Sequence, residues 1–330
     1  MTYYFYITSY NNMDLADSKN IDTRGVDALP EFTAQFNDQN IHTDNTIQHI
    51  VISGGGCMGF AYYGILREAH KHHLWHIENI QTIYGTSIGS IIATILCLDY
   101  DWNTLDNYLI KRPWEKVFHY DIQTLFTCVQ NNGIFNRNIT EQMLKPLLLG
   151  KDISIDITLA DFYKITNIDL HIMVTNAIVF ESVDISAKTH PKWSLIDAIH
   201  ASCSIPILFK PIYLDNVIYC DGGFCVNYPI NQSISNGANP DNTLGIQSIS
   251  INNEDIDTTT FSLFDFILHL LNKLLNKIVD HRPCKIRHIF SVPIDMRSLS
   301  NITNVAEQQT VREEMIQLGC DIFHTQYTLN

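Results

Sequence analysis

A serine in the frame Gly85-x-Ser87-x-Gly89 is the residue of this 330-residue chain whose setting most clearly favours chemistry. An apolar run at 79–84 precedes the motif and a helix-like run at 90–98 follows it. In a nucleophile elbow, a sharp strand-to-helix turn exposes the serine hydroxyl, and flanking glycines remove side chains that would collide with nearby backbone. The following helix directs the positive end of its dipole at the reacting centre. The pattern predicts a nucleophilic serine. The alternative is a glycine turn whose only role is to pack a helix on a sheet.

A glycine-rich loop, "SGGGCMG" at residues 53–59, lies upstream of the serine. A phosphate-binding loop needs Gly-Lys-Ser/Thr, which is missing here, and a dinucleotide fingerprint needs an acid about 20 residues later, where residues 74–76 are Leu-Trp-His. Acyl transfer needs backbone N–H donors for the developing oxyanion, and losing one donor costs ~10²–10³ in rate. We therefore expect Gly54, Gly55 and Gly56 to form an oxyanion hole, followed by the motif glycine Gly59.

The serine also needs a base, for which two alternatives stand. Histidine is the usual choice, and His281, His288 and His324 follow the serine at positions that suit an order of Ser, Asp, His. The other candidate is Asp221, a carboxylate at a strand end that is followed by Gly222 and Gly223.

The elements around these motifs predict an α/β fold. Twice within fifty residues an apolar strand (47–52, then 79–84) ends in glycines and leads into a helix (60–73, then 90–98). This order predicts a parallel sheet covered by helices, with both loops at the carboxyl ends of strands, where such sheets bind ligands. Further helices are expected around 102–117, 140–149 and 194–206, and further strands at 170–180, 216–223 and 242–251.

Taken in order, the glycine loop, the Ser87 motif and Asp221-Gly222-Gly223 resemble the patatin-like phospholipase family. The segments 157–176 and 200–230 are also similar to the stretches that lead to that family's catalytic aspartate. The likeness covers roughly residues 47–231.

The resemblance implies a three-layer α/β/α fold with a mostly parallel sheet and a Ser–Asp dyad. Ser87 would be the nucleophile, Asp221 the base, and the Gly54–Gly56 backbone the oxyanion hole. The implied activity is calcium-independent, phospholipase A-type hydrolysis of phospholipid or neutral-lipid esters (EC 3.1.1.-) through an acyl-enzyme, with no cofactor and no metal. With an aspartate base, the rate is expected to fall only at acid pH unless burial raises the pKa of Asp221.

The chain departs from the family at Met58, where an arginine or lysine is common. The neighbouring Cys57 lies inside the same loop and is expected to act as a small space-filling side chain. A soluble carboxylesterase or acyltransferase, and a catalytically silent lipid-binding protein on the same fold, are the alternatives to a lipid acyl hydrolase.

The charge, the apolar runs and the cysteines of the chain indicate which kinds of partner and surroundings suit it. The net charge is −14 with only 21 lysines and arginines, which argues against a nucleic-acid binder. No apolar run is long enough for a transmembrane span. Eight cysteines without a CxxC pair, and a start unlike a signal peptide, predict a reducing, cytoplasmic protein that is peripheral to membranes when it acts on a membrane or micelle surface.

Two further segments are a group of histidines at the end of the first motif helix and an apolar stretch near the C-terminus. Histidines at 70, 72, 73 and 76 lack a carboxylate or cysteine partner in a zinc-like spacing, so a solvated helix end is expected there. Residues 261–279 are expected to form an amphipathic helix, for which a core or interdomain role is favoured, with membrane contact or a homodimer interface as alternatives.

The chain is expected to divide into three parts. Residues 1–45 form an N-terminal extension, 46–255 the catalytic domain, and 256–330 a helical part packed on the same domain.

Overall fold

The computed structural model describes residues 46–250, five positions between 266 and 273, 283–294 and 300–328. The predicted extension at 1–45 lies outside these residues, as does most of the predicted helix at 261–279. Within the described part, no helix is both long enough and apolar enough to cross a bilayer.

A sheet of eight strands forms the centre of the described fold, in the order β5-β6-β3-β2-β1-β7-β8, with β4 also paired to β3. The pairs β1–β2, β1–β7, β2–β3 and β7–β8 are parallel, whereas β3–β4, β3–β6 and β5–β6 are antiparallel. The strands are β1 (His49–Ile52), β2 (Thr82–Thr86), β3 (Asp169–Asn176), β4 (Glu181–Ile185), β5 (Ile212–Leu214), β6 (Val217–Asp221), β7 (Thr243–Ser250) and β8 (His288–Ile294). The predicted α/β class with a mostly parallel sheet is confirmed.

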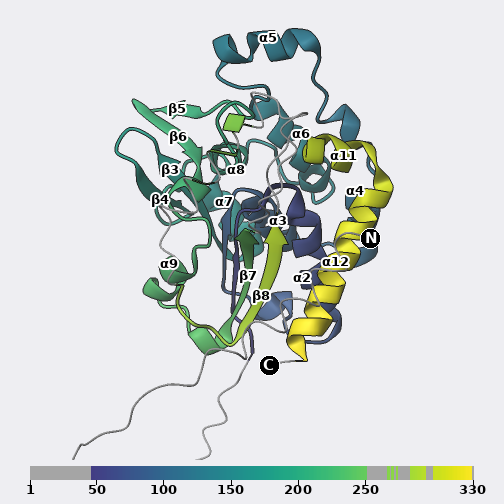
Figure 1. The fold of residues 1–330 in the computed structure, drawn as a ribbon. Coiled ribbons are helices and arrows are strands. Elements are labelled where there is room, and N and C mark those ends of the chain that lie inside the picture. Colours follow the sequence, from purple (N-terminus) through teal and green to yellow (C-terminus); the bar gives the residue numbers. More distant parts are fainter. Residues whose placement is uncertain are drawn as a thin grey trace, which may run out of the picture. The chain divides into compact units, whose positions relative to one another are not determined.

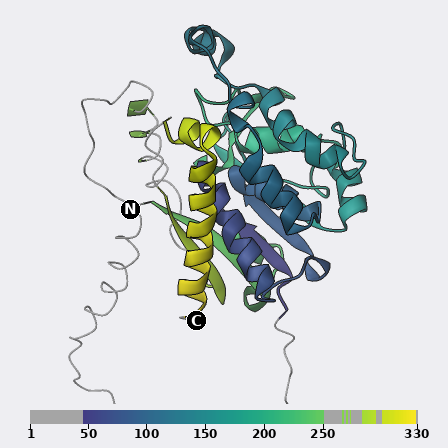
Figure 2. The same cartoon turned by 90° about the vertical axis from the view of Figure 1, so that its right-hand side faces the viewer.

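Helices lie around this sheet (Figures 1 and 2). They are α2 (Gly59–Lys71), α3 (Ile88–Cys97), α4 (Trp102–Lys111), α5 (Ile122–Asn131), α6 (Arg137–Leu149), α7 (Leu159–Thr166), α8 (Leu195–Ser202), α9 (Ile230–Ser235), α11 (Ser300–Glu307) and α12 (Gln309–Tyr327). Short 3₁₀ turns are η1 (Gly56–Met58), η2 (Ile77–Asn79), η3 (Trp114–Lys116), η4 (Gly222–Phe224) and η5 (Pro240–Asn242).

The two faces of the sheet bury unequal cores because side chains alternate along each strand. Ile50 and Ile52 of β1 join the large core with α2, α3, α8 and α12, while Val51 joins a small cluster with Ile230 of α9. The three-layer arrangement predicted from the sequence is therefore present, with one thick and one thin outer layer.

Two local predictions differ from the structure, and one further helix has no counterpart among the predicted elements. The helix expected over 102–117 ends at Lys111, because Pro113 forces an extended backbone at Arg112. Helix α5 was not anticipated. Residues 256–330 were expected to be helical, but β8 within them pairs with β7, and its sequence HIFSVPI buries every second residue.

Helices α2 and α12 pack unusually closely, side by side in both views (Figures 1 and 2). A β-carbon on Gly64 would lie 2.2 Å from the carbonyl oxygen of Ile316, and one on Gly319 would lie 2.1 Å from that of Ala61. Glycine at both positions allows the two backbones to touch, which ties the C-terminal helix to the helix that follows the glycine loop.

Candidate active site

Ser87 lies in a sharp turn between β2 and α3, as its motif predicts. Its backbone has φ 53° and ψ −126°, a conformation that is uncommon for a residue other than glycine. Backbone strain of this kind persists only where the surrounding structure holds it in place. The residue is 7% exposed and contributes to the lining of an apolar cavity.

The flanking glycines are required by crowding. A β-carbon on Gly85 would lie 2.6 Å from both Ser90 Cα and the carbonyl carbon of Gly89. A β-carbon on Gly89 would lie 2.5 Å from the carbonyl oxygen of Ile52. Helix α3 can therefore begin directly against β1 and β2 only with glycine on both sides of the serine.

Two serines satisfy the peptide groups of the strained residue. The Ser87 N–H donates to Ser202 Oγ (2.9 Å), whose own hydroxyl donates to the carbonyl of Met173 (2.6 Å). Ser90 Oγ donates to the Ser87 carbonyl (2.7 Å). Ser202 belongs to no motif in the sequence, because only the packing of α8 on β3 brings it to the elbow.

The pairing of strands in the sheet brings Asp221 close to Ser87. In the register of β3, Met173 pairs with Thr86 on one side, and Val174 pairs with Asp221 on the other. Ser87 follows Thr86 directly, so the serine and the carboxylate flank Val174 although they are far apart in the sequence.

The Asp221 carboxylate is buried, with 5% of the residue exposed. Oδ1 accepts a hydrogen bond from the Gly223 N–H (2.7 Å), while Oδ2 has no hydrogen-bond partner in the part of the chain that is described. Burial raises the pKa of Asp221 from 3.8 to about 6, although the nearby Ser87 hydroxyl and the Gly223 N–H act in the opposite direction.

The glycine loop lies beside the elbow, but its three glycines are not equivalent. The Gly54 N–H donates to the Asn227 carbonyl (3.0 Å), so it is not free to bind an oxyanion, and this part of the prediction was wrong. Among the described residues, the N–H groups of Gly55 and Gly56 donate to no acceptor. Gly54 instead serves close packing, since its β-carbon would lie 3.3 Å from Ser87 Cβ.

A network of polar side chains holds this loop. Tyr62 donates to the carbonyl of Gly54 (3.0 Å), and its hydroxyl lies 3.2 Å from Ser53 Oγ. Ser53 Oγ also accepts from the backbone N–H of Ser248 (2.9 Å), and Asn227 Nδ2 donates to Ser248 Oγ (2.9 Å). The loop is thus anchored to both α2 and β7 before any substrate binds.

Met58 and Cys57 face different surroundings. Met58 is 4% exposed and packs in the main core, where a charged side chain would be costly to bury. Cys57 contributes to the wall of the cavity that also contains Ser87. In the described loop, the groups available to a substrate are therefore backbone N–H groups and no cationic side chain.

The cavity at Ser87 is lined almost entirely by apolar side chains. Helix α3 contributes Ile88, Ile91, Ile92 and Ile95, which share one face of the helix at i, i+3, i+4 and i+7. The other lining residues are Gly56, Cys57, Gly59, Phe60, Tyr108, Leu109, Trp114, Phe118, Thr140, Met143, Cys203, Ile205, Leu208, Phe209, Val305 and Ala306. Such a lining suits an aliphatic chain rather than a polar ligand.

A buried arginine fixes one wall of this cavity. Arg312 of α12 is 3% exposed and donates to the carbonyls of Val305 (2.7 Å) and Ala306 (3.0 Å) at the end of α11. It also donates to the carbonyl of Ile110 (2.7 Å) near the end of α4. The cation satisfies carbonyls at two helix C-termini, where positive charge is favourable.

The histidines considered as bases lie elsewhere or outside the described residues. His288 begins β8 at the amino end of that strand, and His324 lies near the end of α12, while His281 falls outside the described part. Both ring nitrogens of His200 are occupied, by Thr140 (3.0 Å) and the Lys210 carbonyl (2.9 Å). No hydrogen bond joins a described histidine to Ser87 or Asp221, which leaves Asp221 as the candidate base in preference to these histidines.

Replacing the buried carboxylate is expected to stabilise the protein. Because the pKa of Asp221 is higher in the folded state, ionisation penalises folding increasingly from about pH 4 to pH 6 and fully above it. Asp221→Asn should therefore raise the free energy of unfolding by up to about 3 kcal/mol at pH 7 and by little at pH 4. Urea denaturation at both pH values measures this, with the exposed Asp241→Asn as control. A variant no more stable than the parent at pH 7 would contradict the buried charge.

Comparison with known proteins places this site in a family. Residues 50–234 match the patatin-like phospholipases, a region that covers more than half of the chain and contains Ser87 and Asp221. The chain is 26% identical to an uncharacterized protein of Acanthamoeba polyphaga mimivirus, over 87% of this chain and 89% of that protein. It is 28% identical to a probable lipid hydrolase of Invertebrate iridescent virus 6, over 56% of this chain and 62% of that protein.

Among solved structures, VipD from Legionella pneumophila matches 84% of this chain and 66% of its own, with a TM-score of 0.49 and 14% identity. The resemblance predicted from the motifs is confirmed by the family match: this chain belongs to the patatin-like phospholipase family of lipid hydrolases.

Proposed function

We propose that this protein hydrolyses acyl esters of phospholipids or neutral lipids through a covalent intermediate on Ser87. One observation carries the proposal. Ser87 and Asp221 flank Val174 across β3, and the Asp221 oxygen Oδ2, buried without a described partner, is an acceptor beside an apolar cavity.

In the acylation step, Ser87 Oγ attacks the ester carbonyl carbon and its proton passes to Asp221 Oδ2. The tetrahedral intermediate collapses as the ester C–O bond breaks, and the leaving alcohol takes the proton from Asp221. In the deacylation step, water gives a proton to Asp221 and attacks the acyl-enzyme. Ser87 then recovers a proton from Asp221, and the fatty acid is released.

The negative charge on the carbonyl oxygen requires donors that are already oriented. The N–H groups of Gly55 and Gly56, which have no acceptor in the described part of the chain, support this role, together with the N-terminus of α3 directly after Ser87. An aspartate is a weak base for a serine, so these fixed dipoles would supply much of the acceleration.

The cavity supports an acyl chain as the group that is recognised. Its isoleucine stripe on α3 begins at Ile88, next to the nucleophile, so a chain lying along it would hold its carbonyl carbon at Ser87. The family resemblance implies that calcium takes no part, and turnover is expected to persist in EDTA.

Exposed apolar residues gather at the edge of the sheet where Ser87 lies. Phe126 and Val129 on α5 are 80% and 84% exposed, and α5 projects beyond the strand ends (Figures 1 and 2). Ile178, Val179 and Phe180 follow the carboxyl end of β3, and Tyr213 and Leu214 belong to the β5–β6 hairpin at the same edge.

These three segments support a lipid surface as the partner. Backbone hydrogen bonds between residues 134–135 and 207–208 join the base of α5 to the cavity wall, and the Cys225 thiol contacts the carbonyl of Phe180. We infer that they insert between lipid headgroups and open the cavity toward the acyl chains. With a net charge of −14, apolar insertion rather than charge attraction would hold the protein at the surface.

The dyad is tested by substitution on a phospholipid with different acyl chains at its two positions, in EDTA. Ser87→Ala is expected to lower kcat by ~10⁴-fold or more, and Asp221→Asn by roughly 10⁴-fold, because one lacks the nucleophile and the other the base. Mass spectrometry of the products identifies the bond cleaved. Asp197→Asn serves as a control carboxylate outside the cavity lining.

Full activity in Asp221→Asn would refute the dyad. Acyl transfer to an added alcohol at the expense of fatty-acid release would identify an acyltransferase instead.

The pH profile follows from the buried carboxylate. Because Asp221 must be ionised to accept the serine proton, log kcat/KM should fall with unit slope below about pH 6. The sequence predicts an acid limb at lower pH unless burial raises the pKa of Asp221, and burial does raise it. Since histidine titrates near 6.5, the limb is best measured at several temperatures. Carboxyl ionisation has almost no enthalpy, so a limb that moves with temperature like an imidazole would argue against Asp221.

The lipid surface is tested with phosphatidylcholine vesicles and a soluble short-chain ester. Phe126→Ser combined with Val129→Ser is expected to lower vesicle hydrolysis at least tenfold and to leave ester hydrolysis unchanged. The matched control changes Tyr163 and Ile165 to serine, an exposed apolar pair on α7 that precedes the amino end of β3. If both double variants lost vesicle hydrolysis equally, α5 would not be a specific contact with the lipid surface.

A further inference from the structure

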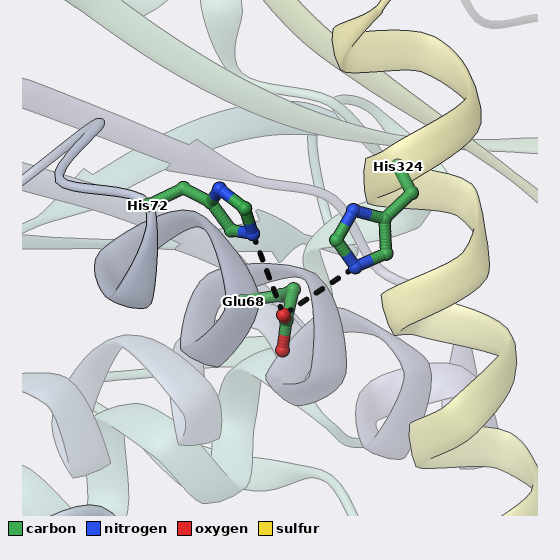
Figure 3. A group of neighbouring side chains, drawn as sticks. All are labelled: Glu68, His72 and His324. Carbon is green, nitrogen blue, oxygen red and sulfur yellow. Dashed lines mark ion pairs between the residues drawn. The ribbon is translucent and has the colours of Figure 1, made fainter.

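The histidines that end α2 do not share one environment. His70 accepts a hydrogen bond from Trp102 Nε1 (3.0 Å) and packs edge-on against Trp75. His72 instead faces α12, where its ring lies 5.2 Å from that of His324 (Figure 3). The sequence prediction of a solvated helix end was therefore wrong for His70 and incomplete for His72.

A carboxylate lies between the two facing imidazoles. Glu68 Oε1 is 3.6 Å from His72 Nε2 and 3.4 Å from His324 Nε2 (Figure 3). One ligand atom from each residue lies within 4.8 Å of the other two. The carboxylate partner that the sequence did not reveal thus comes from one turn earlier on α2, and the second histidine from the far end of the chain.

We propose that Glu68, His72 and His324 bind a zinc ion that joins α2 to α12. Two imidazoles and one carboxylate form a ligand set that zinc accepts in proteins, with water in the fourth position. In a tetrahedral site with bonds near 2.0–2.1 Å, ligand atoms lie about 3.4 Å apart, close to both nitrogen–oxygen distances here.

The surroundings allow the site to close around an ion. The side chains of His72 and His324 are 45% and 52% exposed, so both rings can rotate toward a metal, while that of Glu68 is 14% exposed and held in place. Lys71 Nζ lies 3.1 Å from Glu68 Oε2 and leaves Oε1 to face the histidines. The C-terminus of α2 favours positive charge and offsets part of the repulsion from Lys71.

The close packing of α2 and α12 holds the two ligand-bearing helices in place beforehand. Contact at Gly64 and Gly319 sets their separation, and His324 lies little more than one turn beyond Gly319. Gly59, at the other end of α2, is about 20 Å away along the helix axis, so the ion would act on the stability of the helix pair and not on acyl transfer.

The experiment uses the full chain after EDTA treatment and dialysis. Zinc affinity is measured by competition with a chromophoric chelator, and cobalt is used as a visible probe of the ligands. One ion per chain is expected. His72→Ala, His324→Ala and Glu68→Gln should each weaken zinc binding at least tenfold, since loss of even an outer-shell partner costs about 10–100-fold.

His73→Asn is the matched control, because it removes the adjacent exposed histidine and asparagine tolerates the positive φ of 57° at that position. Zinc should raise the melting temperature of the parent and of His73→Asn but not that of His324→Ala. Circular dichroism without metal verifies that all variants are folded.

Three results would overturn the proposal. They are no zinc binding at micromolar concentrations, unchanged affinity in both His72→Ala and His324→Ala, or a cobalt spectrum with a thiolate charge-transfer band, which would place the ion on cysteine. None of these measurements depends on hydrolysis, so the site and the proposed lipid hydrolysis can fail independently.

Discussion

At Gly85 and Gly89 the backbones of β2, α3 and β1 come so close that no β-carbon fits between them. This approach forces Ser87 into a positive-φ turn and begins α3 immediately after it. The strained turn is held from outside, through Ser202 on its N–H and Ser90 on its carbonyl. Every other feature of the site is arranged around this fixed point.

Helix α3 has apolar residues on nearly all sides because it contacts both the main core and the cavity. One side packs against the sheet in the main core, and the stripe from Ile88 to Ile95 forms a wall of the cavity. Other parts of the wall come from α4, α6 and α11, and Arg312 ties α4 to α11 through their terminal carbonyls. The residues that stabilise the fold and those that would bind an acyl chain are thus partly the same.

The buried carboxylate lowers the stability of the fold at neutral pH. Asp221 loses hydration on folding, and one N–H from Gly223 on Oδ1 compensates only in part. A second donor on Oδ2 would stabilise the ion but would occupy the buried oxygen that has no partner among the described residues. The resulting rise in pKa brings an aspartate near the range of histidine, which would strengthen it as the proposed base at neutral pH.

The sequence alone determined the sharp turn at Ser87, the aspartate at the end of β6 and the parallel strands around the turn. These features depend on local rules, namely the apolar period of strands and helices and the need for glycine where backbones touch. Tertiary structure decided that Gly54 is bound by Asn227, that Ser202 supports the elbow and that burial raises the pKa of Asp221. It also decided that Glu68, His72 and His324 meet. Each of these depends on contacts between segments distant in the chain, where spacing along the sequence carries no information about distance.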